Sequence, residues 1–285
     1  MNSLVIIGLG LMGGSVAKAL KNQNPDIKIS AYDHNPSALD LAQDVGIIDH
    51  KINALNDINN LEPNEADIII IAVPVIESLK VYDSINSLFN SDIAITDTAS
   101  AKLLIHNYLA DNYSSPSNII LSHPMAGSHN TGVGYADEAM FNNKKVLITE
   151  ITESKNHCLT SVTNLWKSLG ADVINIDSMK HDEIISYASH LPHVISYAVL
   201  DSIMKNPNSN ITTFSAGGLR DFVRIAGSDP KMWTDIFLSN KESISSSIDA
   251  YKDSLDEIKK LIEDGDDEAL RNFLTLIKDY KNSKF

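Results

Sequence analysis

The chain has 285 residues, a length that suits two domains better than one small core. Its 43% hydrophobic and 21% charged residues are the balance of an ordinary soluble globular protein. The formal net charge of −14 argues against nucleic acid or an anionic membrane as a partner, because both need clustered positive charge. With one cysteine, Cys158, and no uninterrupted apolar run long enough to cross a membrane, we expect a cytoplasmic protein without a disulfide framework.

Strand and helix patterns alternate over the first 177 residues. Short β-rich runs predict strands over residues 3–8, 27–33, 67–74, 92–98, 118–124, 145–150 and 171–177. Helical patterns lie between most of them, for example over residues 13–21, 36–44, 75–89 and 154–169. Residues 68–73 are apolar on both faces, as in a parallel strand that helices cover from both sides. We therefore predict an α/β domain with a doubly wound sheet of the Rossmann type over residues 1–177.

Beyond residue 177 the strand patterns stop and helical periodicity takes over. One helical stretch is predicted over residues 178–204, with Pro192 as a start, a break or a kink inside it. Asp229 and Pro230 form a helix-start signal, and the pattern after them runs for about 34 residues to Gly265, unless it breaks near residues 243–247. One more helix is predicted over residues 268–281.

A helix as long as the one predicted to end at Gly265 often finds apolar cover in a second subunit. We therefore predict that residues 178–285 form an all-helical substrate and dimerisation domain, and that the protein is a homodimer.

A dinucleotide-binding fingerprint, G-x-G-x-x-G, follows the first predicted strand and opens a helical run. Its residues are Gly8, Leu9, Gly10, Leu11, Met12 and Gly13. The first glycine permits a tight turn, the second lets the backbone approach a pyrophosphate, and the third lets the helix pack close to the strand. The helix N-terminus then offers free N–H groups to the phosphates.

Asp33 ends the next predicted strand, where the fingerprint expects a ribose-binding carboxylate. A carboxylate repels a 2′-phosphate, and the next two residues, His34 and Asn35, include no arginine that could hold such a phosphate. We therefore expect NAD as the cofactor rather than NADP, with Val73 and Pro74, at the end of the third predicted strand, among the cofactor contacts.

Three further clusters have no evident structural need. Residues 122–129 (SHPMAGSH) follow a predicted strand, and ligands of open α/β sheets bind beyond the carboxyl ends of the strands. Residues 189–193 (SHLPH) and 217–224 (GGLRDFVR) lie in the helical part. The two histidines of SHLPH have no third ligand or carboxylate pattern beside them, so we expect no metal.

The chain resembles the prephenate/arogenate dehydrogenase family in the stretches GLGLMGGS, DTASAK, HPMAGS, SHLPH and GGLRDFVRIAGSDPKMW, which occur in the family's order from Gly8 to Trp233. The resemblance implies that His123 is the catalytic base or hydrogen-bond acceptor for a ring hydroxyl. Ser100 would bond near that hydroxyl and help to position His123. Arg224 would bind a substrate carboxylate, and His193 would line the pocket.

The resemblance also implies supporting roles for His190 and Asp221, which would orient the pocket or pair with Arg224. Many relatives carry Thr-Glu where this chain has Ser128 and His129, although another part of the family shares Ser-His there. Both residues are expected at the substrate, but the gating role of that glutamate does not carry over to His129.

The expected activity is therefore NAD-dependent oxidative decarboxylation of prephenate to 4-hydroxyphenylpyruvate in tyrosine biosynthesis. A histidine suits proton acceptance near neutral pH, and arginine presents a planar fork to a carboxylate. Arogenate, which has an amino group in place of the keto group, remains the alternative substrate, and His129 in place of an acid favours prephenate. A β-hydroxyacid dehydrogenase and a non-catalytic NAD sensor are the other readings, although Lys180 and Lys205 sit in no matching context for the lysine base of the former.

Overall fold

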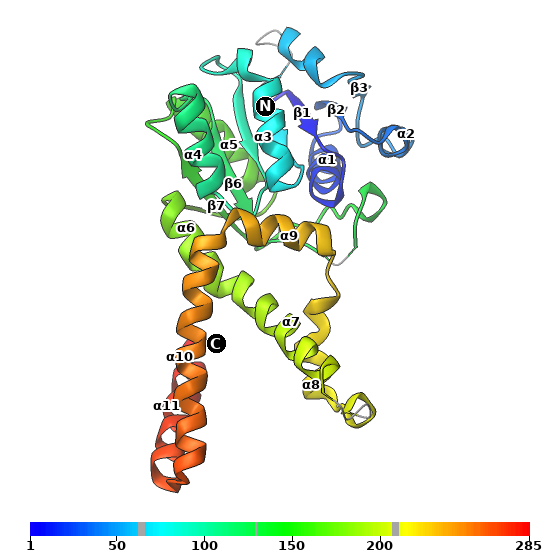
Figure 1. Ribbon diagram of the computed structural model, residues 1–285. Coiled ribbons are helices and arrows are strands. Elements are labelled where there is room, and N and C mark those ends of the chain that lie inside the picture. The colour runs from blue at the N-terminus through cyan, green and yellow to red at the C-terminus, as the bar shows by residue number, and fades with distance from the viewer. Residues whose placement is uncertain (62–65, 129, 207–210) are drawn as a thin grey trace. The chain divides into compact units, whose positions relative to one another are not determined.

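The computed structural model describes residues 1–61, 66–128, 130–206 and 211–285. They form two compact units, residues 1–240 and residues 241–285 (Figure 1). The predicted boundary between residues 177 and 178 divides the chain differently and stays a prediction. Among the described residues, every helix is either too short or too polar to cross a lipid bilayer.

A parallel sheet of five strands forms the centre of the first unit, in the order β3-β2-β1-β4-β5. These strands are β1 (Ser3–Ile7), β2 (Lys28–Tyr32), β3 (His50–Lys51), β4 (Ile68–Ile71) and β5 (Ala94–Asp97). The order reverses beside β1, as in the doubly wound sheet that the sequence predicts. Strand β3 was not predicted, because two residues are too few to show a periodicity.

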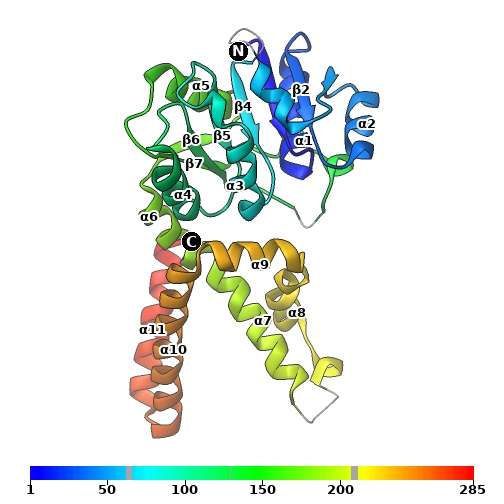
Figure 2. The same cartoon turned by 45° about the horizontal axis from the view of Figure 1, so that its top comes forward.

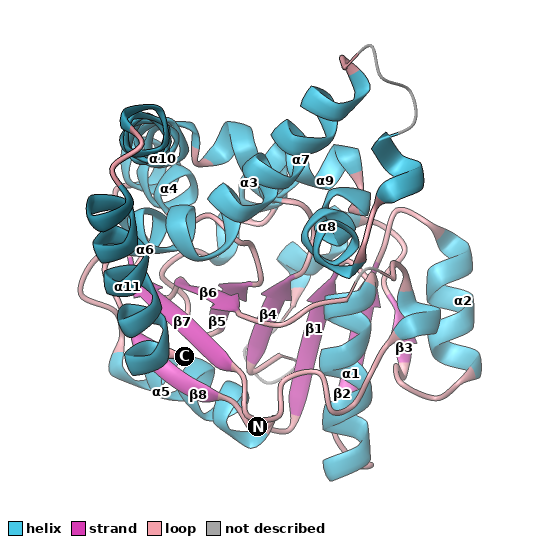
Figure 3. Cartoon of the chain, turned by 90° about the horizontal axis from the view of Figure 1, so that it is seen from below, coloured by secondary structure: helices cyan, strands magenta, loops and turns pink. Residues whose placement is uncertain are grey.

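Helices cover both faces of this sheet: α1 (Leu11–Gln23), α2 (Pro36–Asp44), α3 (Val75–Ser84), α4 (Leu103–Tyr113) and α5 (Asn156–Ser168). Leu4 and Ile6 point into one core together with α1, α2 and α5, whereas Val5 and Ile7 point into a second core with α3 and α4. Figure 3 shows α3 and α4 on one side of the strands and α5 on the other. Burial on both sides explains why β4 is apolar at every position and why β1 is apolar from Leu4 to Ile7.

The second sheet does not continue the alternation of parallel strands and helices. It contains β6 (Ile120–Pro124), β7 (Lys145–Glu150) and β8 (Asp172–Asn175), with β6 antiparallel to β7 and β7 parallel to β8. A bridge between Ile95 and Ile119 runs β6 parallel to β5. A parallel neighbour needs a crossover, usually helical, and in the described part of the 125–144 connection the only helical element is the short turn Val133–Tyr135. The chain therefore returns antiparallel.

The helical part begins with α6 (Ser178–Ile185), continues through a π-helical turn (Ser186–His190) and goes on as α7 (Leu191–Met204). Pro192 lies in the first turn of α7, directly after the π-helical turn, so it marks an irregularity inside a helical segment that continues from α6. Two helices follow, α8 (Gly217–Val223) and α9 (Pro230–Ser239). Short 3₁₀ turns span Leu55–Asn60, Asn86–Leu88, Val133–Tyr135, Ile211–Phe214 and Arg224–Gly227.

The single long helix predicted from Asp229 to Gly265 is wrong. The chain leaves helical geometry at Asn240, which has φ −119° and ψ 34°, between α9 and α10 (Lys241–Asp264). This break lies just before the alternative position at residues 243–247. Asn240 turns its side chain inward, where its amide donates to the backbone oxygen of Asp182 and to Nδ1 of His190. Side-chain bonds of this kind compete with helix continuation.

The second unit is a pair of helices, α10 and α11 (Asp267–Lys284), which lie side by side (Figure 2). Gly265 ends α10 with a φ of +65°, as expected of a glycine stop, and Asp266 caps the start of α11 by accepting from the N–H of Ala269. Several large apolar side chains of this unit are exposed, namely Leu255, Ile262, Leu274, Leu276, Ile277 and Tyr280.

Candidate active site

The predicted site residues of the first unit gather at one edge of the sheets. Gly8 follows β1, Val73 follows β4, and Ser100 follows β5. His123 lies in the last part of β6, which runs in the same direction as β5. Ligands of open α/β folds bind at this carboxyl edge, so the fold brings the glycine loop and the histidine motif to the same side of the molecule.

The glycine loop has the close packing that the fingerprint requires. Gly8 has a φ of +99°, and a Cβ placed there would lie 2.7 Å from the carbonyl oxygen of Ala72. A Cβ on Gly13 would lie 2.0 Å from the carbonyl oxygen of Gly8, so only glycine lets α1 approach β1 this closely. In contrast, a Cβ on Gly10 would meet nothing within 4 Å. This open space lies at the N-terminus of α1, where no side chain caps the helix, and it suits a phosphate group.

Asp33 stands beside this loop. Its Oδ2 accepts from the N–H of Leu9 at 2.6 Å, and its Oδ1 accepts from the N–H of Asn35 at 2.8 Å. These two bonds fix the carboxylate next to the fingerprint, where a ribose diol would meet it. Val73 is half-buried and would touch a Cβ on Gly8, and Pro74 precedes α3 at its N-cap position. Leu11 and Met12 open α1 beside the loop.

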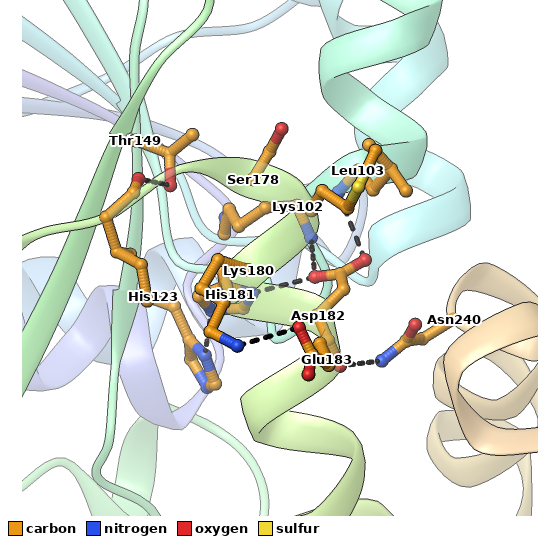
Figure 4. Close-up of polar contacts among 12 residues, drawn as sticks. Lys102, Leu103, His123, Thr149, Ser178, Lys180, His181, Asp182, Glu183 and Asn240 are labelled. Carbon is orange, nitrogen blue, oxygen red and sulfur yellow. Dashed lines mark hydrogen bonds and ion pairs between the residues drawn. The ribbon is translucent and has the colours of Figure 1, made fainter. Parts of the chain in front are cut away.

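His123 is buried and belongs to a chain of three polar side chains. Its Nδ1 lies 2.9 Å from Nε2 of His181, and Nδ1 of His181 lies 2.7 Å from Oδ1 of Asp182. The carboxylate of Asp182 also accepts from two backbone N–H groups at the start of α4, those of Lys102 at 2.8 Å and Leu103 at 3.1 Å. Figure 4 shows these residues converging from β6, α4 and α6.

A buried ion pair supports this arrangement from the side of β5. Nζ of Lys102 lies 2.5 Å from Oδ2 of Asp97, and both side chains are fully buried. Oδ1 of Asp97 accepts from the N–H of Ser122, the residue before His123. Asp97 therefore connects the end of β5 to β6. Lys102 compensates the negative charge of Asp97, because the buried carboxylate has no contact with solvent.

The histidines of the site are held in the neutral form. Burial lowers the pKa of His123 well below its usual value, and His181, Lys102 and His190 lower it further. Burial also lowers the pKa of His181, although its hydrogen bond to Asp182 acts in the opposite direction. His190 is buried on the π-helical turn, and burial lowers its pKa to about 4. These rings are therefore uncharged at neutral pH, so each can accept a proton at one nitrogen and donate an N–H from the other.

The SHLPH motif places two histidines against Trp233 of α9. His193 stacks on the indole with ring centroids 3.6 Å apart, and its Nδ1 donates to the carbonyl oxygen of Ser189 at 3.0 Å. His190 accepts at Nδ1 from Asn240 at 3.2 Å, so its proton is on Nε2. Among the described residues, that Nε2 and Nε1 of Trp233 are buried without a hydrogen-bond partner. Buried N–H groups of this kind are suited to a bound ligand.

The other predicted substrate residues have fewer fixed contacts. Arg224 is exposed at the end of α8, and its charge helps to lower the pKa of His193, so the two lie near each other. Asp221 is also exposed, and its expected role in orienting the pocket or pairing with Arg224 stays a prediction. Ser128 is exposed and accepts from the N–H of Asn130. His129 lies outside the described residues.

Sequence reasoning missed part of this network. Ser100 was expected to help position His123, and that role stays a prediction, whereas the direct ring partner of His123 is His181. His181, Asp182, Lys102 and Asn240 had no predicted role. The adjacent His181-Asp182 pair on a helix after the sheet domain, and the aspartate and lysine of DTASAK, were the available signals.

Two family models together match most of the chain. The nucleotide-binding domain of prephenate dehydrogenase matches residues 16–175, and the dimerization domain of prephenate dehydrogenase matches residues 177–276. The prephenate dehydrogenase of Lactococcus lactis is 35% identical over 280 residues, which cover 96% of this chain and 75% of that protein. The cyclohexadienyl dehydrogenase of Zymomonas mobilis is 32% identical over 269 residues, which cover 92% of this chain and 90% of that protein.

Solved structures agree with these matches. The crystal structure of prephenate dehydrogenase from Aquifex aeolicus, in complex with hydroxyphenyl propionate and NAD⁺, has a TM-score of 0.91 and 31% identity, and the alignment covers 99% of this chain and 98% of that one. The Rossmann-like fold with a helical C-terminal region, which the sequence predicted, is confirmed.

The different surroundings of Gly13 and Gly10 predict different effects of the same substitution. Gly13→Ala should lower the free energy of unfolding by about 1–3 kcal/mol, because α1 must move away from the carbonyl oxygen of Gly8. Gly10→Ala should leave stability unchanged, since its φ of −77° suits alanine, but should weaken dinucleotide binding by filling the open space. Urea denaturation and NADH titration measure the two effects, and equal stability of the two variants would contradict the packing argument.

Burial of His190 predicts a loss of stability in acid. The pKa of the His190 side chain is near the ordinary value of 6.5 in the unfolded chain and about 4 in the folded chain. Stability is therefore lost as pH falls through this window, by at most a few kcal/mol, since each unit of pKa difference is worth about 1.4 kcal/mol. The dependence of unfolding free energy on pH should be shallower in His190→Asn. The control is His34→Asn, because the side chain of His34 is 92% exposed, and an unchanged slope in His190→Asn would refute the assignment.

Proposed function

Because the chain belongs to the prephenate dehydrogenase family, we propose that it catalyses the NAD-dependent oxidative decarboxylation of prephenate to 4-hydroxyphenylpyruvate, a step of tyrosine biosynthesis. One feature of the site supports this reaction above the others. A buried, uncharged histidine, His123, lies at the same sheet edge as the dinucleotide loop. Hydride transfer from a carbon that bears a hydroxyl needs such a base beside the cofactor.

The enzyme is an NAD-dependent dehydrogenase, and its residues fit that cofactor. The open space at Gly10 and the uncapped N-terminus of α1 would receive the pyrophosphate. Asp33 would accept bonds from the ribose hydroxyls and repel a 2′-phosphate, and His34 and Asn35 offer no arginine to offset that repulsion. When bound, NAD⁺ supplies the acceptor for the hydride of the substrate.

The role of His123 follows from the bonds that the reaction changes. Prephenate carries a hydroxyl and a hydrogen on ring carbon C4 and a carboxylate on C1. His123 takes the hydroxyl proton as hydride leaves C4, which makes that carbon a carbonyl. The bond between C1 and its carboxylate then breaks, CO₂ departs, and the electron pair passes around the ring to the C4 oxygen. His123 returns the proton to that oxygen, so the phenol forms and no proton is left over.

Groups of the helical part would hold the two carboxylates. Arg224 offers a planar fork of N–H donors, and the Nε2 proton of His190 and the Nε1 proton of Trp233 are buried donors without a partner among the described residues. His193, stacked on Trp233 and near Arg224, would line the same pocket. This excess of donors suits a keto acid with two carboxylates, whereas the ammonium group of arogenate needs an acceptor. We therefore place prephenate before arogenate as the substrate.

We propose further that the enzyme is a homodimer in the cytoplasm. The dimerization-domain model matches residues 177–276, and the second unit carries exposed leucine, isoleucine and tyrosine side chains along α10 and α11. Exposed apolar rows on paired helices are typical of surfaces that a partner covers.

NADH formation measured by absorbance tests the proposed reaction directly. The purified protein should reduce NAD⁺ with prephenate, release CO₂ in equal amount, and turn over arogenate more slowly. Faster turnover of arogenate would reverse the substrate assignment and leave the cofactor and His123 in place. Absence of turnover with both compounds, in protein that still binds NADH, would refute the proposed function.

Arg224 is expected to contribute substrate affinity and little else. Arg224→Ala should raise the KM for prephenate about 10- to 100-fold, since a charged hydrogen bond contributes roughly 1.5–3 kcal/mol. The dissociation constant of NADH should stay the same. Arg224→Lys keeps the charge but not the fork and should fall between. Arg271→Ala, on α11 where Arg271 pairs with Asp267, is the control. An unchanged KM in Arg224→Ala would remove Arg224 from the pocket.

A further inference from the structure

We propose that His181 and Asp182 are positioning residues that set the tautomer of His123, so that Nε2 of His123 presents its lone pair to the substrate hydroxyl. The three side chains form one line of hydrogen bonds from β6 to the N-terminus of α4. The inference rests on the proposed function, in which His123 takes and returns the hydroxyl proton.

The direction of the line is set at Asp182. Its carboxylate accepts from the backbone N–H groups of Lys102 and Leu103 and faces Nδ1 of His181 at 2.7 Å. An ionised carboxylate only accepts hydrogen bonds, so the proton of this bond belongs to Nδ1 of His181. The start of α4 favours the negative charge, because the free N–H groups and the dipole of a helix N-terminus attract anions.

The tautomer of His181 then decides that of His123. A neutral imidazole carries one proton, so with Nδ1 protonated, Nε2 of His181 is an acceptor. It faces Nδ1 of His123 at 2.9 Å, and that nitrogen must therefore carry the proton of His123. The remaining nitrogen, Nε2 of His123, is left with a free lone pair. The reverse order would set bare Nδ1 of His181 against the carboxylate oxygens, in a place where no water reaches.

The groups around His181 leave this order undisturbed. Lys102 is paired with Asp97, so these two charges offset each other. His190 accepts from Asn240 and does not hydrogen-bond to His181. The negative charge of Asp182 is then the charge that balances His123 while it holds the substrate proton. His181 and Asp182 are 0% and 1% exposed, and because the reaction returns the proton to the product, they need no path to water.

Two substitutions of His181 separate positioning from packing. His181→Leu removes the acceptor, so the ring of His123 loses its preferred tautomer, its orientation and its link to the charge of Asp182, and kcat should fall by about 10- to 100-fold with little change in KM, less than the 10²–10⁴-fold that loss of the whole base costs. His181→Gln supplies an amide oxygen near the place of Nε2 and should retain more kcat than His181→Leu. His123→Asn gives the lower limit of the scale. His106→Gln is the matched control, because His106 on α4 bonds to Ser178 of α6 outside this line.

Asp182→Asn presents an amide that can donate to Nδ1 of His181, which reverses the direction of both hydrogen bonds from residue 182 to His123. The comparable change in the Ser-His-Asp triad lowers kcat by about 10⁴-fold. Since Asp182 also binds the start of α4, thermal unfolding must first show that this variant is folded. If Asp182→Asn is unfolded, the comparison of His181→Leu with His181→Gln is the test.

The nitrogen chemical shifts of ¹⁵N-labelled His123 provide a measurement without substrate. In the wild-type protein Nε2 should be unprotonated and Nδ1 protonated, and His181→Leu should mix the two states. A protonated Nε2 in the wild type, or equal kcat in the leucine and glutamine variants, would overturn the positioning role. Because the shifts do not depend on turnover, a failure of the proposed reaction would leave this result readable by itself.

Discussion

The carboxylate of Asp182 joins the sheet part of the molecule to its first C-terminal helix. It sits on α6, yet it accepts the first free N–H groups of α4, which would otherwise lack partners in a buried place. The same carboxylate fixes His181, and His181 fixes His123. One buried anion therefore holds the start of a helix, the contact between two parts of the fold and the orientation of the proposed base. Its removal would disturb all three together, which is typical of polar networks in low-dielectric surroundings.

The parallel sheet of the Rossmann type and its covering helices could be predicted from the sequence because both follow from local patterns. Strands apolar on both faces, such as β4, indicate burial from two sides, and the spacing of Gly8, Gly10 and Gly13 after a predicted strand indicates the dinucleotide-binding turn. The place of His123 at the carboxyl edge followed from its position after a predicted strand. These inferences need no knowledge of distant contacts.

The line of hydrogen bonds from His123 through His181 to Asp182, and the helix break at Asn240, could not be predicted in this way. Both depend on contacts between residues far apart in the sequence. His123 and His181 are 58 residues apart, and nothing in either motif indicates that they meet. The residues around Asn240 continue a helical pattern, and the helix ends there because the amide finds better partners in Asp182 and His190. Tertiary hydrogen bonds here outweigh local propensity, as they do for many polar residues near helix ends.

The π-helical turn between α6 and α7 has a consequence for how the histidines are presented. His181 and His190 are nine residues apart, about two and a half turns of a regular α-helix, so an uninterrupted helix would point them in opposite directions. A π-turn rotates less per residue and swings the second histidine back toward the first. The amide of Asn240 then reaches both His190 and the carbonyl of Asp182. The π-helical turn therefore changes the direction in which His190 points, so that one continuous helical segment presents His181 and His190 to the same site.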